Sequence, residues 1–254
     1  MDSEKIPASG HDSVVIIPMY NEKENAAAII DAVIALPEPV DILVIDDNSP
    51  DGTAAIVKAK IAEYPDRIHL IERQGKLGLG TAYICGFLWA IDMGYDYICE
   101  MDADFSHNPE DLIRLIATCR KDADVAVGSR YVSGVNVVNW PMGRVLMSYY
   151  ASAYVRMITR MPVRDTTAGF VCYRREVLQT IPLDKIRFKG YAFQIEMKFT
   201  AYKYGFRIEE VPIIFVNRVL GTSKMNTGIF GEAVFGVIRL KWNSFFKKYK
   251  RPDR

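Results

Sequence analysis

Three polar clusters follow predicted strands in this 254-residue chain. They span Pro18 to Glu22, Asp46 to Asn48 and Asp102 to Asp104. Ligands of an open parallel sheet bind beyond the carboxyl ends of its strands. We therefore expect separate parts of the chain to bring an aromatic ring and several carboxylates to one edge of the sheet.

The triplet Asp102-Ala103-Asp104 has a definite chemical use. A nucleotide diphosphate gains negative charge as its bond to a sugar breaks, and a hard divalent cation stabilises that charge. Mg²⁺ is typically held by one or two protein carboxylates, while substrate phosphates fill other positions. The triplet therefore indicates a site for Mg²⁺ or Mn²⁺. The alternative is a polar loop that caps the next helix.

The same tripeptide occurs again at Asp122-Ala123-Asp124. This copy precedes a predicted strand instead of following one, so it should face the opposite edge of the sheet. We interpret it as a solvated turn. Position in the sheet, and not the tripeptide itself, therefore carries the functional interpretation.

Three further features near this edge each have a functional and a structural interpretation. The segment Gly75–Gly80 matches neither the dinucleotide fingerprint nor a P-loop. It is either a loop close to a nucleotide or a tight turn. Tyr20 could stack on a base or only pack at a strand end. Glu22 could bind ribose hydroxyls or favour the next helix start through the helix dipole. Tyr20 and Glu22, together with Asp47, favour a nucleotide site.

The elements that would position these residues alternate along the first half of the chain, which is typical of a parallel sheet wrapped by helices. We predict strands at Val14–Pro18, Ile42–Ile45, Ile68–Ile71, Tyr97–Met101 and Val125–Val127. We predict helices at Lys23–Leu36, Gly52–Tyr64, Leu79–Met93 and Pro109–Arg120. Asn108 and Ser49 each precede a proline and acidic residues, as expected of helix caps.

The second half is less regular. We predict helices at Met142–Met161, Phe193–Tyr204 and Ile229–Lys248, and strands at Phe170–Tyr173 and Glu210–Val216. The fold class is therefore α/β, with a mostly parallel sheet flanked by helices. We predict a polar tail at residues 1–12, a catalytic domain at residues 13–225 that includes an amphipathic helix at about 142–161, and a C-terminal amphipathic helix with a basic tail at residues 226–254.

The overall composition excludes several classes of protein. The net charge of +1 argues against a nucleic-acid binder, which would carry a strong basic excess. The four cysteines lack C-x-x-C spacing, so we expect free thiols and neither a zinc site nor a disulfide framework. The N-terminus lacks the pattern of a signal peptide, and no run of about 18 apolar residues predicts a spanning helix. We expect a cytoplasmic protein.

Six segments together resemble a known family. Pro18–Glu22, Asp46–Gly52 and Asp102–Pro109 resemble the inverting glycosyltransferases with a GT-A fold. Three further segments narrow the resemblance to the polyprenol (dolichol) phosphate mannose synthases: Gly128–Tyr131, Lys189–Gln194 and Arg218–Lys224. Enzymes of that family transfer mannose from GDP-mannose to a lipid phosphate. It extends from about Val14 to Lys224, and its specificity lies in the combination of motifs.

The resemblance implies roles for individual residues. The nucleotide-sugar pocket would contain Pro18, Tyr20, Glu22, Ile45, Asp47, Asp102, Ala103, Asp104, Lys189, Arg218 and Lys224. The metal would be held by Asp102 and Asp104, with Ser106 at the position where some relatives carry a glutamine ligand. The acceptor phosphate would contact Arg130, Arg144 and Ser148, and the catalytic residues would be Asp102, Asp104 and Arg130. Asn48 replaces a frequent glycine, which suggests a slightly different turn.

The acceptor chemistry agrees with arginines at such a site. A lipid phosphate needs no catalytic base, because its oxygen is already anionic near neutral pH. It needs positive charge to approach a second anion, and a guanidinium binds phosphate in a bidentate fork. Arg130 follows a predicted strand, where we favour this role over that of an ordinary surface arginine.

Two amphipathic helices predict contact with a membrane. Between Met142 and Met161, polar residues recur every four positions among apolar and aromatic ones, which suits either a membrane interface or a core helix with outward arginines. The helix at Ile229–Lys248 places Trp and Phe beside Lys and Arg, as in an interfacial anchor or a packed helix. We expect peripheral attachment to the cytosolic face of a membrane.

The sequence thus predicts a metal-dependent enzyme that moves mannose from GDP-mannose to a polyprenyl or dolichyl phosphate. One alternative is the same fold with another donor, such as UDP-glucose, or another membrane-associated acceptor. A nucleotidyltransferase is a second alternative, although it should carry a basic, glycine-rich loop after its first strand. A third is a nucleotide sensor without turnover.

Overall fold

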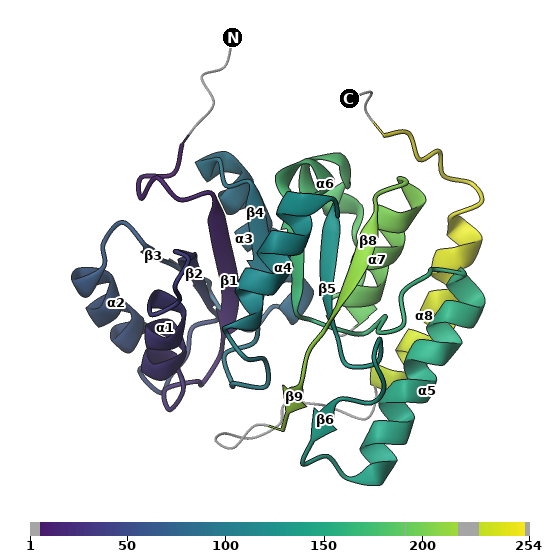
Figure 1. Cartoon of the computed structure of the whole chain (residues 1–254), viewed down its shortest axis with the longest axis horizontal. Helices are drawn as coiled ribbons and strands as arrows, with labels where there is room; N and C mark the ends of the chain where they lie inside the picture. The colour runs from purple at the N-terminus through teal and green to yellow at the C-terminus, as the bar shows by residue number, and fades with distance from the viewer. Residues whose placement is uncertain (1–5, 191, 218–228, 252–254) are drawn as a thin grey trace.

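The computed structural model describes residues 6–190, 192–217 and 229–251, with side chains in the last segment from residue 235 onward. A seven-stranded sheet lies between two layers of helices, and a small two-stranded sheet lies below its lower edge in Figure 1. The strand order is β3-β2-β1-β4-β7-β5-β8. The strands are β1 Ser13–Met19, β2 Asp41–Asp46, β3 Ile68–Glu72, β4 Tyr97–Glu100, β5 Val125–Ser129, β7 Val171–Arg174 and β8 Ile208–Pro212.

All pairs in the large sheet are parallel except those made by β7, which runs antiparallel to β4 and β5. The small sheet pairs β6 with β9 in parallel. Its strands are β6 Val137–Val138 and β9 Phe215–Val216. The helices are α1 Ala26–Ile34, α2 Thr53–Glu63, α3 Leu79–Met93, α4 Asp111–Lys121, α5 Met142–Thr159, α6 Arg175–Thr180, α7 Ala192–Lys203 and α8 Ile229–Asn243, with a short 3₁₀ turn at Leu183–Lys185.

Alternate residues of the buried strands pack into two separate cores. Val15 and Ile17 of β1 face the core shared with α1 and α4, whereas Val14 and Ile16 face the core shared with α3 and α7. Strands covered by helices on both faces need apolar side chains at every position, which explains their unbroken hydrophobic runs. Gly86 allows α3 to approach β1, because a Cβ there would lie 2.7 Å from Ile16 Cγ2.

The predicted strands and helices of the first half are confirmed, with shifted boundaries. The single strand predicted at Glu210–Val216 is wrong, because the chain leaves the large sheet after β8 and pairs with β6 as β9. The cap predicted at Ser49 is also wrong. Asp51 Oδ1 accepts the N–H of Thr53 at 3.0 Å, while Ser49 Oγ donates to Asp46. The predicted domain boundary at 225 and 226 falls outside the described residues.

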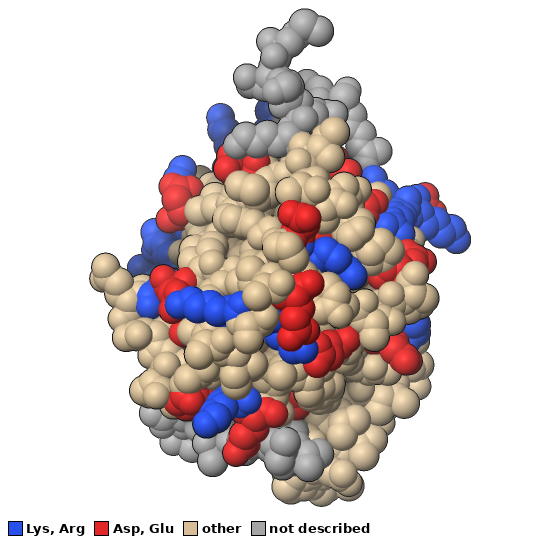
Figure 2. Space-filling view, turned by 90° about the vertical axis from the view of Figure 1, so that its left-hand side faces the viewer, with Lys and Arg blue, Asp and Glu red and all other residues tan. Residues whose placement is uncertain are grey.

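The two ends of the sheet carry different surfaces. Acidic and basic side chains are interspersed over the face formed by α1, α2 and β3 (Figure 2), where Lys60 pairs with Asp31 at 2.7 Å. At the other end, α5 and α8 lie side by side (Figure 1), and Val155 packs against Val237. Within the described segments no helix is long and apolar enough to cross a membrane. All four cysteines are free, as predicted.

The helix α5 has a buried side and an exposed side. Ser152, Val155 and Thr159 are buried against the domain. Several large apolar side chains of α5 and of the α8 region are exposed instead. They are Met142, Leu146, Met147, Tyr149, Tyr150, Met157, Phe235, Ile238, Trp242, Phe245 and Phe246, and we call this set the apolar face.

Candidate active site

The three predicted acidic and polar clusters lie at the lower edge of the sheet in Figure 1. They follow β1, β2 and β4, and β1 pairs in parallel with the other two strands. The carboxyl ends of these three neighbouring strands therefore carry Tyr20, Asp47 and the Asp102–Asp104 triplet. Parallel pairing is the physical reason that such distant segments meet.

The loop after β4 has a tightly defined conformation. Ser106 donates its main-chain N–H to Asp104 Oδ1 at 3.0 Å, and Asp102 donates its own to His107 Nδ1 at 3.4 Å. The His107 ring stacks on Phe170 at 4.7 Å between centroids. Burial lowers the pKa of His107 to about 4, so this ring is neutral near pH 7. A main-chain N–H of the same loop thus orients the Asp104 carboxylate.

The donor set fits a divalent cation that is shared with a substrate. No group of three or more His, Cys, Asp or Glu side chains in the described part of the chain forms a closed metal site. Two aspartates at a strand end match the way Mg²⁺ is usually held, with phosphate and water completing its shell. Ser106 Oγ is buried and lacks a hydrogen-bond partner among the described residues. Its predicted role as a third ligand stays a prediction.

Asp47 is held by an arginine that the sequence prediction missed. Arg73 donates to both carboxylate oxygens of Asp47, at 2.6 and 2.8 Å, and its third nitrogen donates to Thr81 at 2.7 Å. The available signal was the position of Arg73 directly after β3 (Ile68–Glu72). Asp47 is therefore oriented before any ligand binds. Its role in nucleotide binding stays a prediction.

The glycine segment has a structural explanation. A Cβ on Gly80 would lie 2.8 Å from the carbonyl oxygen of Phe188, and Gly80 N–H donates to the Lys189 carbonyl at 2.8 Å. Gly78 has a φ of +107°, in the region that favours glycine. These glycines allow the segment with Lys189 to pack on the start of α3. The same loop places Lys76 Nζ 5.2 Å from the Tyr20 ring centroid.

The remaining predicted nucleotide residues differ in their access to the edge. Ile45 is fully buried in the core, and its role in the nucleotide pocket stays a prediction. Glu22 accepts a hydrogen bond from Asn25 at 3.0 Å. Pro18 is half-buried and Ala103 is buried. Arg218 and Lys224 lie outside the described residues.

Asn48 lies in the turn after β2, where the family resemblance led us to expect a slightly different turn. Its φ is +60°. Asparagine tolerates this left-handed conformation better than other non-glycine residues. Asn48 therefore adopts a conformation that glycine also adopts, and the expected difference in the turn stays a prediction.

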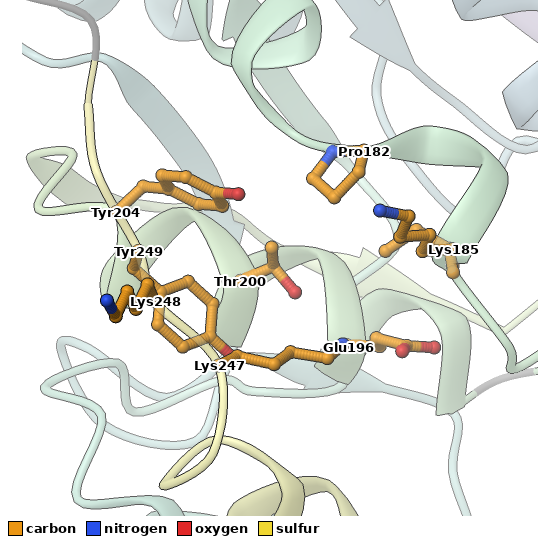
Figure 3. Close-up of a pocket in the computed structure, with 9 residues that line it drawn as sticks. Pro182, Lys185, Glu196, Thr200, Tyr204, Lys247, Lys248 and Tyr249 are labelled. Carbon is orange, nitrogen blue, oxygen red and sulfur yellow. The ribbon is translucent and has the colours of Figure 1, made fainter.

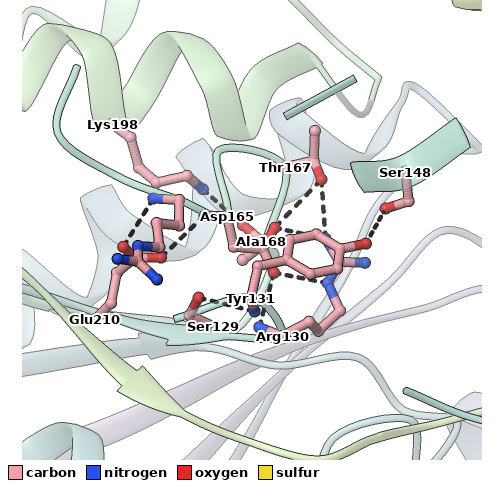
Figure 4. Close-up of polar contacts among 10 residues, drawn as sticks. Ser129, Arg130, Tyr131, Ser148, Asp165, Thr167, Ala168, Lys198 and Glu210 are labelled. Carbon is pink, nitrogen blue, oxygen red and sulfur yellow. Dashed lines mark hydrogen bonds and ion pairs between the residues drawn. The ribbon is translucent and has the colours of Figure 1, made fainter. Parts of the chain in front are cut away.

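Arg130 follows β5, as predicted, but its guanidinium is paired within the protein (Figure 4). It donates to both oxygens of Asp165, at 2.7 and 2.6 Å, and to Thr167 Oγ1 at 2.8 Å. Burial alone would raise the pKa of Asp165, but Arg130 holds it below its usual value. Asp165 N–H in turn donates to Glu210 of β8 at 2.9 Å. Arg130 is therefore rigid and largely charge-compensated, which the sequence did not indicate.

The other two predicted acceptor residues lie on the first turns of α5. Ser148 Oγ accepts a hydrogen bond from Tyr131 OH at 2.7 Å. Arg144 Nη1 donates to Asn217 Oδ1 at 3.1 Å. Since Tyr131 directly follows Arg130, these contacts join the end of β5 to α5. Their role toward an acceptor stays a prediction.

Buried polar contacts of α7, which were not predicted, lie behind this edge of the sheet. Gln194 Nε2 of α7 donates to Glu100 Oε2 at 2.5 Å, and Lys198 Nζ donates to the Ala168 carbonyl at 2.6 Å. Burial raises the pKa of Glu100 and lowers that of Lys198. Glu100 is the last residue of β4. The hydrogen bond from Gln194 therefore fixes α7 against the strand that precedes the Asp102–Asp104 loop.

The second Asp-Ala-Asp copy precedes β5 at the opposite edge, as predicted. The interpretation as a solvated turn is wrong for Asp124, which is buried and accepts the N–H of Arg207 at 2.8 Å. Arg251 of the C-terminal segment lies 3.3 Å from the same carboxylate. The physical reason is that a strand entering the core carries its first residues inward, where a carboxylate must find cationic or N–H partners.

A pocket of about 180 Å³ lies between α7 and the C-terminal segment (Figure 3). Its lining includes Glu196, Thr200 and Tyr204 of α7, and Lys247 and Tyr249 of the C-terminal segment. None of the predicted site residues that the structure describes lines it. The pocket is therefore separate from the carboxyl edge of the sheet.

Comparison with known proteins identifies related sequences. The family model described as "Glycosyl transferase family 2" matches residues 14–181. Polyprenol monophosphomannose synthase of Mycolicibacterium smegmatis is 47% identical over 225 residues, covering 89% of this chain and 85% of that protein. Undecaprenyl-phosphate mannosyltransferase of Micrococcus luteus is 48% identical over 227 residues, covering 89% and 92%.

Solved structures confirm the fold class. Glucosyl-3-phosphoglycerate synthase of Mycobacterium tuberculosis, in complex with Mn²⁺, UDP and glucosyl-3-phosphoglycerate, gives a TM-score of 0.64 at 16% identity, covering 96% of this chain and 82% of that one. A mannosyltransferase of Pyrobaculum calidifontis, in complex with GDP-Man and Mn²⁺, gives 0.59 at 17% identity, covering 99% and 68%. The predicted α/β fold of the GT-A type, with a mostly parallel sheet, is confirmed.

Proposed function

We propose mannose transfer from GDP-mannose to a polyprenyl (dolichyl) phosphate as the reaction of this chain, which belongs to glycosyl transferase family 2 and is a glycosyltransferase. The products would be a β-linked polyprenyl phosphate mannose and GDP. Support comes from two relatives named for mannose transfer to polyprenol or undecaprenyl phosphate, each about as long as this chain.

The donor would bind at the edge formed by β1, β2 and β4. Asp102 and Asp104 would hold Mg²⁺ or Mn²⁺, which neutralises charge on the diphosphate leaving group. Two structural neighbours of this fold are complexes with Mn²⁺, one of them also with GDP-Man. Asp47, oriented by Arg73, and Tyr20 would contact the nucleoside, because both follow the neighbouring strands.

The acceptor would enter from the side of β5 and α5. A phosphate oxygen of the lipid attacks the anomeric carbon, and the bond from that carbon to the diphosphate oxygen breaks. The electron pair leaves with GDP, and no proton has to be removed from the nucleophile. Arg130, held by Asp165, and Arg144 would orient the acceptor anion. A single displacement inverts the configuration, so NMR of the product should show the β-anomer, and retention would rule this mechanism out.

We further propose that the enzyme works at a membrane surface. Arg144 and Ser148 lie on α5, and the same helix contributes Met142, Leu146 and Tyr150 to the apolar face. An exposed apolar set of this size commonly marks an interaction surface. Lipid held at the acceptor residues would therefore extend along a helix that already presents apolar side chains outward. Attachment on the cytosolic face stays a prediction.

The observation that carries the proposal is the placement of Asp102 and Asp104 beside the end of β1, within a family 2 glycosyltransferase. The test uses purified protein, a short polyprenyl phosphate and a panel of GDP-mannose, UDP-glucose and UDP-GlcNAc, each with Mg²⁺, with Mn²⁺ or with EDTA. We expect transfer from GDP-mannose that EDTA abolishes and added metal restores. Transfer only from a UDP-sugar would replace the donor, and tight metal-dependent GDP binding without turnover would favour a sensor.

A further inference from the structure

We propose that Trp140 is a positioning residue that sets the separation of the two acceptor arginines, Arg130 and Arg144. The inference rests on the proposed function, because it concerns the same acceptor phosphate. Trp140 lies in the turn between β6 (Val137–Val138) and α5 (Met142–Thr159).

The indole ring is close to both guanidinium groups. Arg144 Cζ lies 4.1 Å from the centroid of the Trp140 ring, and Arg130 Cζ lies 5.7 Å from it. The two arginines come from different elements, the end of β5 and the first turn of α5. Among the described residues, Trp140 is thus the aromatic group that both of them contact.

The electrostatics explain why a ring is useful at this position. Two guanidinium groups repel one another, but each is attracted to the negative face of an aromatic ring, and Trp is the strongest such partner. An indole that contacts both therefore offsets part of this repulsion, in addition to the compensation that Arg130 receives from Asp165. A further carboxylate in the same place would compete with the acceptor phosphate for Arg144.

The position of the ring is itself fixed by neighbouring elements. Phe215 of β9 packs edge-on against Trp140 at 5.2 Å between centroids, and Arg130 Cζ lies 5.5 Å from Phe215. Trp140 Nε1 is buried and has no acceptor in the described ranges, so its packing and ring face, not a hydrogen bond, account for its orientation.

The same small sheet connects Trp140 to the metal loop. Val216 of β9 donates its N–H to the Ser106 carbonyl at 3.2 Å, and Asn217 donates to the Val138 carbonyl at 3.0 Å. The Asn217 side chain accepts the hydrogen bond from Arg144. The β6–β9 sheet therefore sets the acceptor arginines in register with Asp102–Asp104. Asn217 and Phe215 each contact one of the two arginines, and Trp140 contacts both.

The experiment compares Trp140→Leu and Trp140→Phe with Trp89→Leu. Trp89 is a suitable control because it stacks on Tyr95 and His69, at 5.8 and 4.8 Å, away from both arginines. Steady-state kinetics would be measured with GDP-mannose and a short polyprenyl phosphate, and thermal unfolding would report stability. The KM for the lipid phosphate and the KM for GDP-mannose are determined separately.

We expect Trp140→Leu to raise the KM for the lipid phosphate by about tenfold while the KM for GDP-mannose stays within about twofold. Trp140→Phe should recover most of the loss, since Phe keeps a π face. Trp89→Leu should lower the melting temperature without this KM split. Parallel changes in both KM values, a Phe variant as impaired as the Leu variant, or the same split in Trp89→Leu would overturn the inference. If the wild type transfers mannose but the variants give one of these contrary results, only the role of Trp140 is rejected. If the wild type transfers no mannose, both the proposed function and the role of Trp140 are rejected.

Discussion

The tripeptide Asp-Ala-Asp occurs twice in this chain, at opposite edges of the large sheet. Asp102–Asp104 follows β4 at the carboxyl edge of the sheet, and Asp122–Asp124 precedes β5 at the amino edge. Both copies end in a buried aspartate. Identical residues therefore differ only in the end of the strand to which they are attached.

Their partners show what that difference means. At the amino edge the protein supplies the cations, because Arg251 lies 3.3 Å from Asp124 and the Arg207 N–H binds the same carboxylate. At the carboxyl edge the neighbouring Arg130 is committed to Asp165. The amino-edge copy is built into the fold as an ion pair, whereas the carboxyl-edge copy lies at the edge where we propose that a ligand binds together with a cation.

The largest expected effect comes from Asp104→Ala compared with Asp122→Ala. Loss of Asp104 would remove a proposed metal ligand, so we expect turnover to fall by about a thousandfold or more. Asp122 is exposed at the other edge, so its variant should stay within a few-fold of wild type. Transfer of mannose under saturating metal measures both. Equal losses would refute the argument from position.

Asp124→Ala should lower stability instead of catalysis. It removes one carboxylate from Arg251 and leaves the Arg207 N–H without its acceptor, and the loss of a hydrogen bond to a buried charged group costs about 2–3 kcal/mol. Denaturant unfolding gives this free energy, and kcat of the folded fraction should be unchanged. A stable variant with impaired kcat would show that the amino edge takes part in the reaction.

Mild acid should weaken the carboxyl-edge loop through His107. The unfolded ring has its ordinary pKa of 6.5, whereas burial lowers the folded value to about 4. The contribution of neutral His107 is therefore present above pH 6.5 and is lost as the pH falls from 6.5 to 4. Melting temperatures across this range should fall less steeply in His107→Asn than in wild type. His69, whose pKa burial also lowers, provides a comparison, and His69→Asn should change the slope less because its ring is only half buried.

The smallest expected effect is that of Arg251→Ala. Arg251 also pairs with Glu176 at 2.9 Å and lies 4.3 Å from the Phe206 ring, but its side chain is partly exposed. We expect a loss of about 1 kcal/mol in unfolding free energy, with no change in either KM. Denaturant unfolding and kinetics test this together. A changed KM would connect the C-terminal segment to the site.

Much of the fold was predictable because strand and helix periodicity are local properties. The residues of β1 and β2 form unbroken apolar runs, and the polar clusters begin where those runs stop. The division of the predicted strand at 210–216 was not predictable, because it depends on β9 pairing with β6, about 80 residues away. The resemblance places Ile45 at the nucleotide pocket, but only the structure shows that its side chain is buried in the core shared with α3.

The sequence by itself determined the α/β architecture, the edge to which the carboxylates go and the family. Only the tertiary structure decided which charges are already paired. Arg73 with Asp47, Arg130 with Asp165, and Arg251 with Asp124 join residues 26, 35 and 127 positions apart. The local sequence pattern indicates where a strand ends. The partner of a buried charge depends instead on which elements pack together in the complete fold.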